Sequence, residues 1–209
     1  TGPSLSFETL PVYINSDNFS LQLVAGGEQD KEFLYLLSED AALPTEDDER
    51  WKPFTGDNLT LLFAGEGLHT RYLWARDAVG NLDGPNQLQT TVDLTDPLIT
   101  DFLINSGDNF TNSTELFLSW DAVDAGSGIE AFFISPDNST PDESSIWRPI
   151  GPGTVKDYSF TFDQPGSGAQ TPHLYIRDRA QNVAQDNATI TFDFIPPVGL
   201  LTLPRVTNQ

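Results

Sequence analysis

The stretch TRYLWARDAVGN, residues 70–81, decides the fold of this chain. Its apolar run before Asp77 predicts a buried strand. The Gly80-Asn81 pair that follows predicts a tight turn, because both residue types tolerate the left-handed backbone conformation. A second copy, LYIRDRAQN at residues 174–182, keeps the apolar run, the Arg-Asp pair and the closing Asn. The chain is therefore expected to contain two copies of one β-module.

The segments that flank this strand repeat in the same order. INSDNF at residues 14–19 matches INSGDNF at residues 104–110, and WKP at 51–53 matches WRP at 147–149. Alternating polar and apolar residues, frequent turn signals and the lack of a helical period predict about seven strands in each copy. The predicted strands are 9–15, 19–25, 32–37, 51–54, 59–63, 70–77 and 87–94 in the first copy, and 115–120, 129–134, 158–162, 174–178 and 188–194 in the second.

This pattern predicts an all-β chain made of two tandem immunoglobulin-like β-sandwiches. We expect the first module at residues 1–96 and the second at residues 97–196, with Thr95-Asp96-Pro97 as the joint. Residues 197–209 are expected to open a third module, because Thr-Leu-Pro at 202–204 repeats Thr-Leu-Pro at 9–11. A C-terminal tail that docks back on the second module is the alternative.

The formal net charge of −21 limits the partners of the chain. Its 10 Lys and Arg are too few to neutralise phosphates against 31 Asp and Glu, so nucleic acid is not an expected partner. Anionic membrane surfaces are disfavoured for the same reason, and no apolar run is long enough to insert into a membrane. The chain has no cysteine, which excludes disulfides, thiolate metal sites and a cysteine nucleophile.

Together these residues resemble the immunoglobulin-like, or fibronectin III-like, repeats of bacterial surface proteins and adhesins. The resemblance rests on an acidic loop that closes on Trp-x-Pro, the turn RDAVGN at residues 76–81, and a last strand that runs into Asp-x-x-x-Pro. The second copy departs from the pattern where Gln181 replaces the turn glycine. The resemblance implies an extracellular or cell-surface location and neighbouring modules of the same kind.

Oxygen donors cluster in the turn that follows Arg76, and they suggest a calcium site. Asp77, Asn81 and Asp83 lie in one loop, and Asp96 of the linker is the fourth expected ligand. Calcium takes about six to eight oxygen ligands with flexible geometry, which such a loop and a module joint can supply. The alternative is structural, because an Asp at this position can accept hydrogen bonds from the amides of its own turn. A second acidic cluster consists of Asp121, Asp124 and Glu130.

Catalysis is not expected from this sequence. Neither of its 2 histidines lies beside a recognisable nucleophile motif, and no phosphate-binding loop occurs. Trp51 and Trp147 close equivalent loops, which favours packing at a corner over stacking on a ligand. Trp74 and Trp120 lie inside predicted strands and are expected in the core.

The expected role is that of a non-catalytic spacer, stalk or adhesion module of a bacterial surface or secreted protein. Acidic surfaces would keep such an array extended and soluble. Expected partners are neighbouring modules of the same chain and a protein or glycan on a cell surface. A carbohydrate-binding or accessory module of a secreted glycan-active enzyme is the alternative. Self-association through an exposed strand edge is a third reading.

Overall fold

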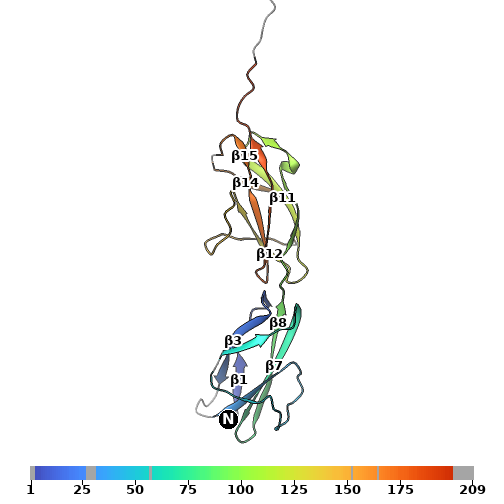
Figure 1. Ribbon diagram of the computed structural model, residues 1–209, viewed down its shortest axis with the longest axis vertical. Coiled ribbons are helices and arrows are strands. Elements are labelled where there is room, and N and C mark those ends of the chain that lie inside the picture. Colours follow the sequence, from blue (N-terminus) through green and yellow to red (C-terminus); the bar gives the residue numbers. More distant parts are fainter. Residues whose placement is uncertain (1–2, 27–31, 57, 152, 164, 200–209) are drawn as a thin grey trace, which may run out of the picture.

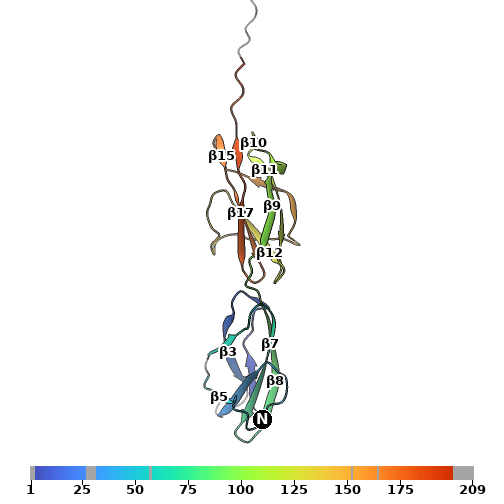
Figure 2. The ribbon, with the colours of Figure 1, turned by 45° about the vertical axis from the view of Figure 1, so that its right-hand side comes forward.

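The computed structural model describes residues 3–26, 32–56, 58–151, 153–163 and 165–199. These residues form two bodies that lie end to end along the long axis (Figures 1 and 2). We call them the N-terminal half (residues 3–93) and the C-terminal half (residues 98–199), and residues 94–97 form the linker. All regular elements among the described residues are strands, apart from the short 3-10 turn η1 (Asn105–Gly107), so the predicted all-β class is confirmed.

The N-terminal half is a sandwich of two sheets around one core. One sheet has the strand order β1-β3-β6, and the other has the order β2-β8-β7-β4-β5. Leu21 and Leu61 of the first sheet share a buried cluster with Leu73 and Leu88 of the second. The strands are β1 (Ser4–Phe7), β2 (Tyr13–Ile14), β3 (Asn18–Gly26), β4 (Phe33–Ser38), β5 (Lys52–Pro53), β6 (Asn58–Leu62), β7 (Gly67–Asp77) and β8 (Leu82–Val92).

The C-terminal half has its own sheets and its own core. Its sheets have the orders β14-β11-β9, β13-β12-β16-β17 and β10-β18-β15. Leu118, Trp120, Phe132 and Ile176 belong to one buried cluster that all three sheets enclose. The strands are β9 (Leu98–Ile104), β10 (Phe110–Thr111), β11 (Glu115–Val123), β12 (Ile129–Ser135), β13 (Arg148–Pro149), β14 (Val155–Thr161), β15 (Gly168–Gln170), β16 (His173–Asp178), β17 (Val183–Asn187) and β18 (Ile190–Phe192).

The two halves repeat one topology. β1 pairs with β3 as β9 pairs with β11, and β4 lies between β5 and β7 as β12 lies between β13 and β16. The short β2 runs parallel to the end of β8, as β10 runs parallel to β18. Every strand pairing among the described residues joins strands of the same half. The repeat seen in the sequence is therefore a repeat of structure, and two cores are consistent with two modules.

The strand that contains residues 70–77 lies in the interior of its sheet. β7 lies between β8 and β4 in the five-stranded sheet, and Trp74 on it is only 6% exposed. Trp120 of the C-terminal half is fully buried, so both tryptophans are buried as predicted, and Trp120 belongs to the core cluster of its half. Gly80 takes the expected left-handed conformation with φ of 91°, and Gln181 takes it too with φ of 79°. The replacement of glycine therefore leaves the turn geometry intact.

Three sequence predictions about strands need correction. The predicted strand 9–15 is wrong, because the chain forms β1 before it and only β2 within it. Pro11 has no N–H to donate to a ladder, which explains the break. The predicted strand 188–194 is shorter, since only β18 pairs there, whereas the predicted strand 87–94 begins earlier, at Leu82. Residues 193–199 form no strand, and the rest of the predicted third-module segment lies outside the described residues.

Each core is expected to unfold as its own unit. Trp120→Ala should destabilise the C-terminal half by about 3–5 kcal/mol, and Leu73→Ala should destabilise the N-terminal half by about 2–5 kcal/mol, because both remove fully buried side chains. Differential scanning calorimetry should show two transitions, each lowered by only one of the variants. A single transition lowered by both would contradict the division.

Candidate metal centre at the joint

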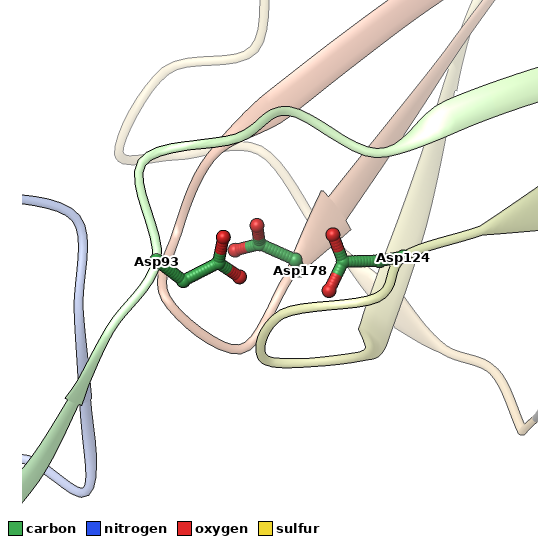
Figure 3. Close-up of side chains that lie close together, drawn as sticks. All are labelled: Asp93, Asp124 and Asp178. Carbon is green, nitrogen blue, oxygen red and sulfur yellow. The ribbon is translucent and has the colours of Figure 1, made fainter. Parts of the chain in front are cut away.

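Three carboxylates meet where the two halves join. Asp93 follows β8 of the N-terminal half, whereas Asp124 follows β11 and Asp178 ends β16 of the C-terminal half. One carboxylate oxygen from each lies within 4.8 Å of the other two. Figure 3 shows the three side chains pointing toward one another from three separate segments. The cluster is therefore a contact between the halves.

Asp93 is fixed by bonds to both halves. Its backbone N–H donates to the carbonyl oxygen of Ile14 at 2.9 Å, which continues the pairing of β2 with β8. Its Oδ1 accepts from the N–H of Thr95 at 3.2 Å, and its Oδ2 accepts from the N–H of Ser127 at 2.6 Å. A methyl group on Gly126 would overlap this carboxylate, so a larger residue there would displace the Asp93 side chain.

Asp178 is held by the turn that repeats the 76–81 motif. Its Oδ1 accepts from the backbone N–H of Asn182 and its Oδ2 from the side-chain amide of Asn182, both at 2.8 Å. The same amide nitrogen donates to the backbone carbonyl oxygen of Asp93 at 2.9 Å. Asn182 therefore links the acidic cluster to the end of β8 by two bonds of one side chain.

Asp124 is the most accessible member of the cluster. Its Oδ1 accepts a short hydrogen bond from the N–H of Gly128. Asp124 and Asp93 both line a surface cleft of about 370 Å³, together with Thr95 and Gly126. Asp124 is the carboxylate of the three that solvent reaches through this cleft, because Asp93 is buried.

The cluster concentrates negative charge where water is largely excluded. Asp93 is 1% exposed and Asp178 is 0% exposed. Among the described residues, none of the three carboxylates forms an ion pair with Lys, Arg or His. Burial, and then the charges of Asp93 and Asp124, raise the pKa of Asp178 above its usual range. Two carboxylates about 4 Å apart repel by about 4 kcal/mol at an effective dielectric constant near 20.

A divalent cation with oxygen ligands is the group that suits this site. Buried charges in proteins are paired or coordinate metals, and the described residues supply no basic partner here. The donors are oxygens alone, with no imidazole or thiolate, which favours calcium or magnesium over zinc. Calcium accepts the irregular geometry and mixed ligands that three fixed carboxylates and water would provide.

The structure does not bring together the four residues predicted as calcium ligands. Asp77 and Asp96 lie beyond opposite ends of β8, which spans 11 residues. The Asp77 carboxylate accepts bonds from the N–H groups of Val79 and Asn81, as the structural alternative predicted. The Asn81 side-chain bond is the main cause that lowers the pKa of Asp77. Asp83 accepts instead from the N–H of Leu5 at 3.2 Å.

The second predicted cluster divides in a similar way. Asp121 pairs with Lys156 at 3.5 Å, and Glu130 pairs with Arg177 at 2.8 Å. Only Asp124 belongs to the three-carboxylate cluster. Asp93 and Asp178 were not predicted as ligands, although a signal existed: Asp93 begins the Asp-x-x-x-Pro spacing, and Asp178 ends the repeated Arg-Asp strand.

The two loop tryptophans pack against arginine in the same way in both halves. The Arg76 guanidinium lies 5.7 Å from the ring centre of Trp51, and the Arg177 guanidinium lies 4.6 Å from that of Trp147. A cation over an aromatic face is a stabilising contact. These contacts agree with the predicted packing role at a corner.

Comparison with known proteins identifies the fold. No family model and no curated protein matches the chain. The fibronectin(III)-like modules of Clostridium thermocellum CbhA match with a TM-score of 0.54 and 9% identity, over 90% of this chain and 94% of theirs. The D00-D0 domain of intimin matches with a TM-score of 0.39 and 13% identity, over 91% and 99%. The tetra-tandem repeat of a large adhesion protein gives 0.31 and 17%, over 93% and 50%.

The first of these similarities shows the fold alone, and it confirms the predicted immunoglobulin-like or fibronectin III-like architecture. The described part of the chain contains no helix that is long and apolar enough to cross a membrane.

Asp124→Asn is expected to stabilise the cation-free protein. The variant keeps an oxygen for the Gly128 N–H and removes one of three like charges. The free energy of unfolding of the C-terminal half in excess chelator should rise by an amount on the order of 1 kcal/mol. Urea denaturation measures this change, with Asp108→Asn as the control because Asp108 is exposed and lies outside the cluster. An unchanged or lower value for Asp124→Asn would contradict the repulsion.

Proposed function

We propose that this chain is a non-catalytic pair of immunoglobulin-like modules, residues 1–96 and 97–196, whose joint binds calcium and which serves as a spacer, stalk or adhesion segment of an extracellular protein. The observation that carries the proposal is the meeting of three carboxylates from both halves, two of them buried, with no basic partner among the described residues. The ion would lie at Asp93, Asp124 and Asp178 in place of the four ligands first predicted.

A cation at this position would act as a clamp between the modules. Asp93 belongs to the N-terminal half, and the other two carboxylates belong to the C-terminal half. Without a cation the three charges repel, and that repulsion opposes the closed joint. A bound cation reverses the sign of the interaction, because each carboxylate is then attracted to a shared centre. Calcium would therefore stiffen the pair.

The linker supports the same role. Glu66 Oε1 accepts from the N–H of Leu94 at 2.9 Å and from the hydroxyl of Thr95 at 2.7 Å, so the linker is bound along the N-terminal half. Pro97 is buried and its ring fixes one backbone angle. A short, anchored linker between two bodies that lie end to end suits a spacer better than a hinge (Figure 2).

The location and partners follow from the charge and from the proposed ion. Extracellular calcium modules bind with dissociation constants of roughly 10⁻⁴–10⁻³ M, which is the range we expect for this site. The net charge of −21 favours a soluble chain that does not associate with copies of itself. Partners of such a segment are further modules in the same polypeptide and a protein or glycan on a cell surface.

The carbohydrate-binding alternative gains no support from the loop tryptophans. Each of them is stacked with an arginine, and they belong to different halves. A sugar platform needs aromatic faces that are free and close together. The spacer role is therefore the one that the geometry favours.

Calcium is expected to stabilise the wild-type protein and to have little effect on Asp124→Asn. At about 100 times its dissociation constant, a ligand that binds only the folded state adds about 2.7 kcal/mol. Calorimetry in calcium, magnesium and chelator measures the shift of the unfolding midpoint. Asp108→Asn serves as the matched control and should shift as the wild type does. Identical midpoints for the wild type in calcium and in chelator would overturn the proposed site.

A further inference from the structure

One basic side chain lies next to the acidic joint without being paired to it. Arg179 directly follows Asp178, and its backbone N–H donates to the carbonyl oxygen of Gly128 at 3.0 Å. Its side chain is exposed, and none of the ion pairs among the described residues includes it. Arginine stays protonated in proteins. The guanidinium is therefore a full positive charge that no counter-ion holds in place.

Arg179 and Asp124 approach the same glycine. The N–H of Gly128 donates a short hydrogen bond to Asp124 Oδ1. The Nη1 atom of Arg179 lies 3.8 Å from the position that a Cβ atom on Gly128 would take. Both side chains also line one cleft of about 530 Å³, whose other walls include Val123 and Ile150. A change of the arginine side-chain torsions is therefore enough to bring the guanidinium onto the Asp124 carboxylate.

The equivalent turn of the N-terminal half has no charge at this position. Asp77 and Asp178 accept the same pair of bonds from the asparagine of their turns. The residue that follows the aspartate is Ala78 in one turn and Arg179 in the other. Because the turn forms with alanine, its backbone geometry does not require the arginine. The positive charge is found in the copy that contributes to the acidic cluster.

We propose that Arg179 competes with the cation for Asp124 and thereby sets the calcium concentration at which the joint becomes stiff. This inference rests on the proposed function, because a competitor has an effect only where calcium binds. Without calcium, the guanidinium pairs with Asp124 and offsets part of the negative charge of the cluster. Calcium displaces it into the cleft, because the ion contacts all three carboxylates, whereas Asp93 and Asp178 are buried from the arginine.

Competition of this kind makes calcium binding weaker and readily reversible. A divalent ion that enters the site must break the pairing of Arg179 with Asp124 and then lie near a like charge. Both effects raise the dissociation constant toward the roughly 10⁻⁴–10⁻³ M of extracellular calcium modules. The joint would then change between a loose and a stiff state as the surrounding calcium varies in this range, where an uncontested site would stay filled.

Isothermal titration calorimetry with calcium on the full chain at fixed ionic strength tests the competition. Arg179→Gln should lower the dissociation constant by roughly three- to tenfold, because it removes one positive charge near a divalent ion in a partly solvated site. Arg179→Lys keeps the charge and should stay close to the wild type. Lys52→Gln is the matched control, since it removes one positive charge at the exposed strand β5 of the N-terminal half.

Urea denaturation separates competition from a structural role of the side chain. In chelator, Arg179→Gln should lower the unfolding midpoint of the C-terminal half, because the carboxylates lose the positive charge beside them. In saturating calcium, the midpoint of this variant should equal or exceed that of the wild type, because the ion has already displaced the guanidinium. A midpoint lowered equally in both conditions would indicate packing alone and would overturn the inference.

The titrations also distinguish this inference from the proposed function. Calcium binding by the wild type, with an unchanged or higher dissociation constant in Arg179→Gln, would overturn the inference and leave the proposed function standing. A wild type that binds no calcium would overturn both. Should Arg179→Gln fold poorly, Arg179→Ala provides the same comparison, because Ala78 occupies the equivalent position in an intact turn.

Discussion

The contact between the two halves brings three carboxylates together, so the arrangement of the halves depends on what offsets the repulsion between them. Asp93 and Asp178 are both buried, and Asp124 lies beside them, yet none of the three forms an ion pair among the described residues. Oxygens of the three carboxylates accept hydrogen bonds from Ser127, Asn182 and Gly128. These donors are neutral, so the negative charge of the carboxylates is not compensated. The proposed divalent cation would balance this charge, and the raised pKa of Asp178 shows how strongly the site disfavours a third ionised carboxylate.

Two equivalent turns in this chain show how burial changes the pKa of a carboxylate. Asp77 and Asp178 occupy equivalent turns and accept the same pair of bonds from an asparagine. The pKa of Asp77 is lowered, chiefly by its asparagine, whereas the pKa of Asp178 is raised, chiefly by burial. Since the turns match, the reversal comes from what surrounds Asp178, which is burial first and then the charges of Asp93 and Asp124. The same turn therefore has a different carboxylate pKa depending on whether it is buried beside other carboxylates.

The sequence predicted the fold well because the fold depends on local patterns. Each local pattern predicts the structure of the segment that carries it. Examples are the repeated Arg-Asp strand, the Trp-x-Pro corner and the alternating polar and apolar residues of β3 and β11. The site depends instead on which segments approach in space. The linker residue Asp96 is the ligand that the sequence predicts, but Asp96 is exposed and Asp93 is buried. Aligning Asp93 with Asp193 in the two repeats would have identified the position, although no local pattern reveals that Asp178 of the next module faces it.

The position of Asp93 explains why an ion there would control the angle between the modules. Asp93 is the last residue whose N–H is tied to the N-terminal sandwich through Ile14, and its carboxylate already lies against Ser127 of the C-terminal half. No free rotatable backbone separates the anchored strand from the ligand atom. An ion held by Asp96 would lie three residues farther along, so the intervening backbone torsions would remain between the ion and the sandwich. If an ion binds at Asp93, stiffness of the pair follows from having the ligand at the end of the strand instead of within the linker.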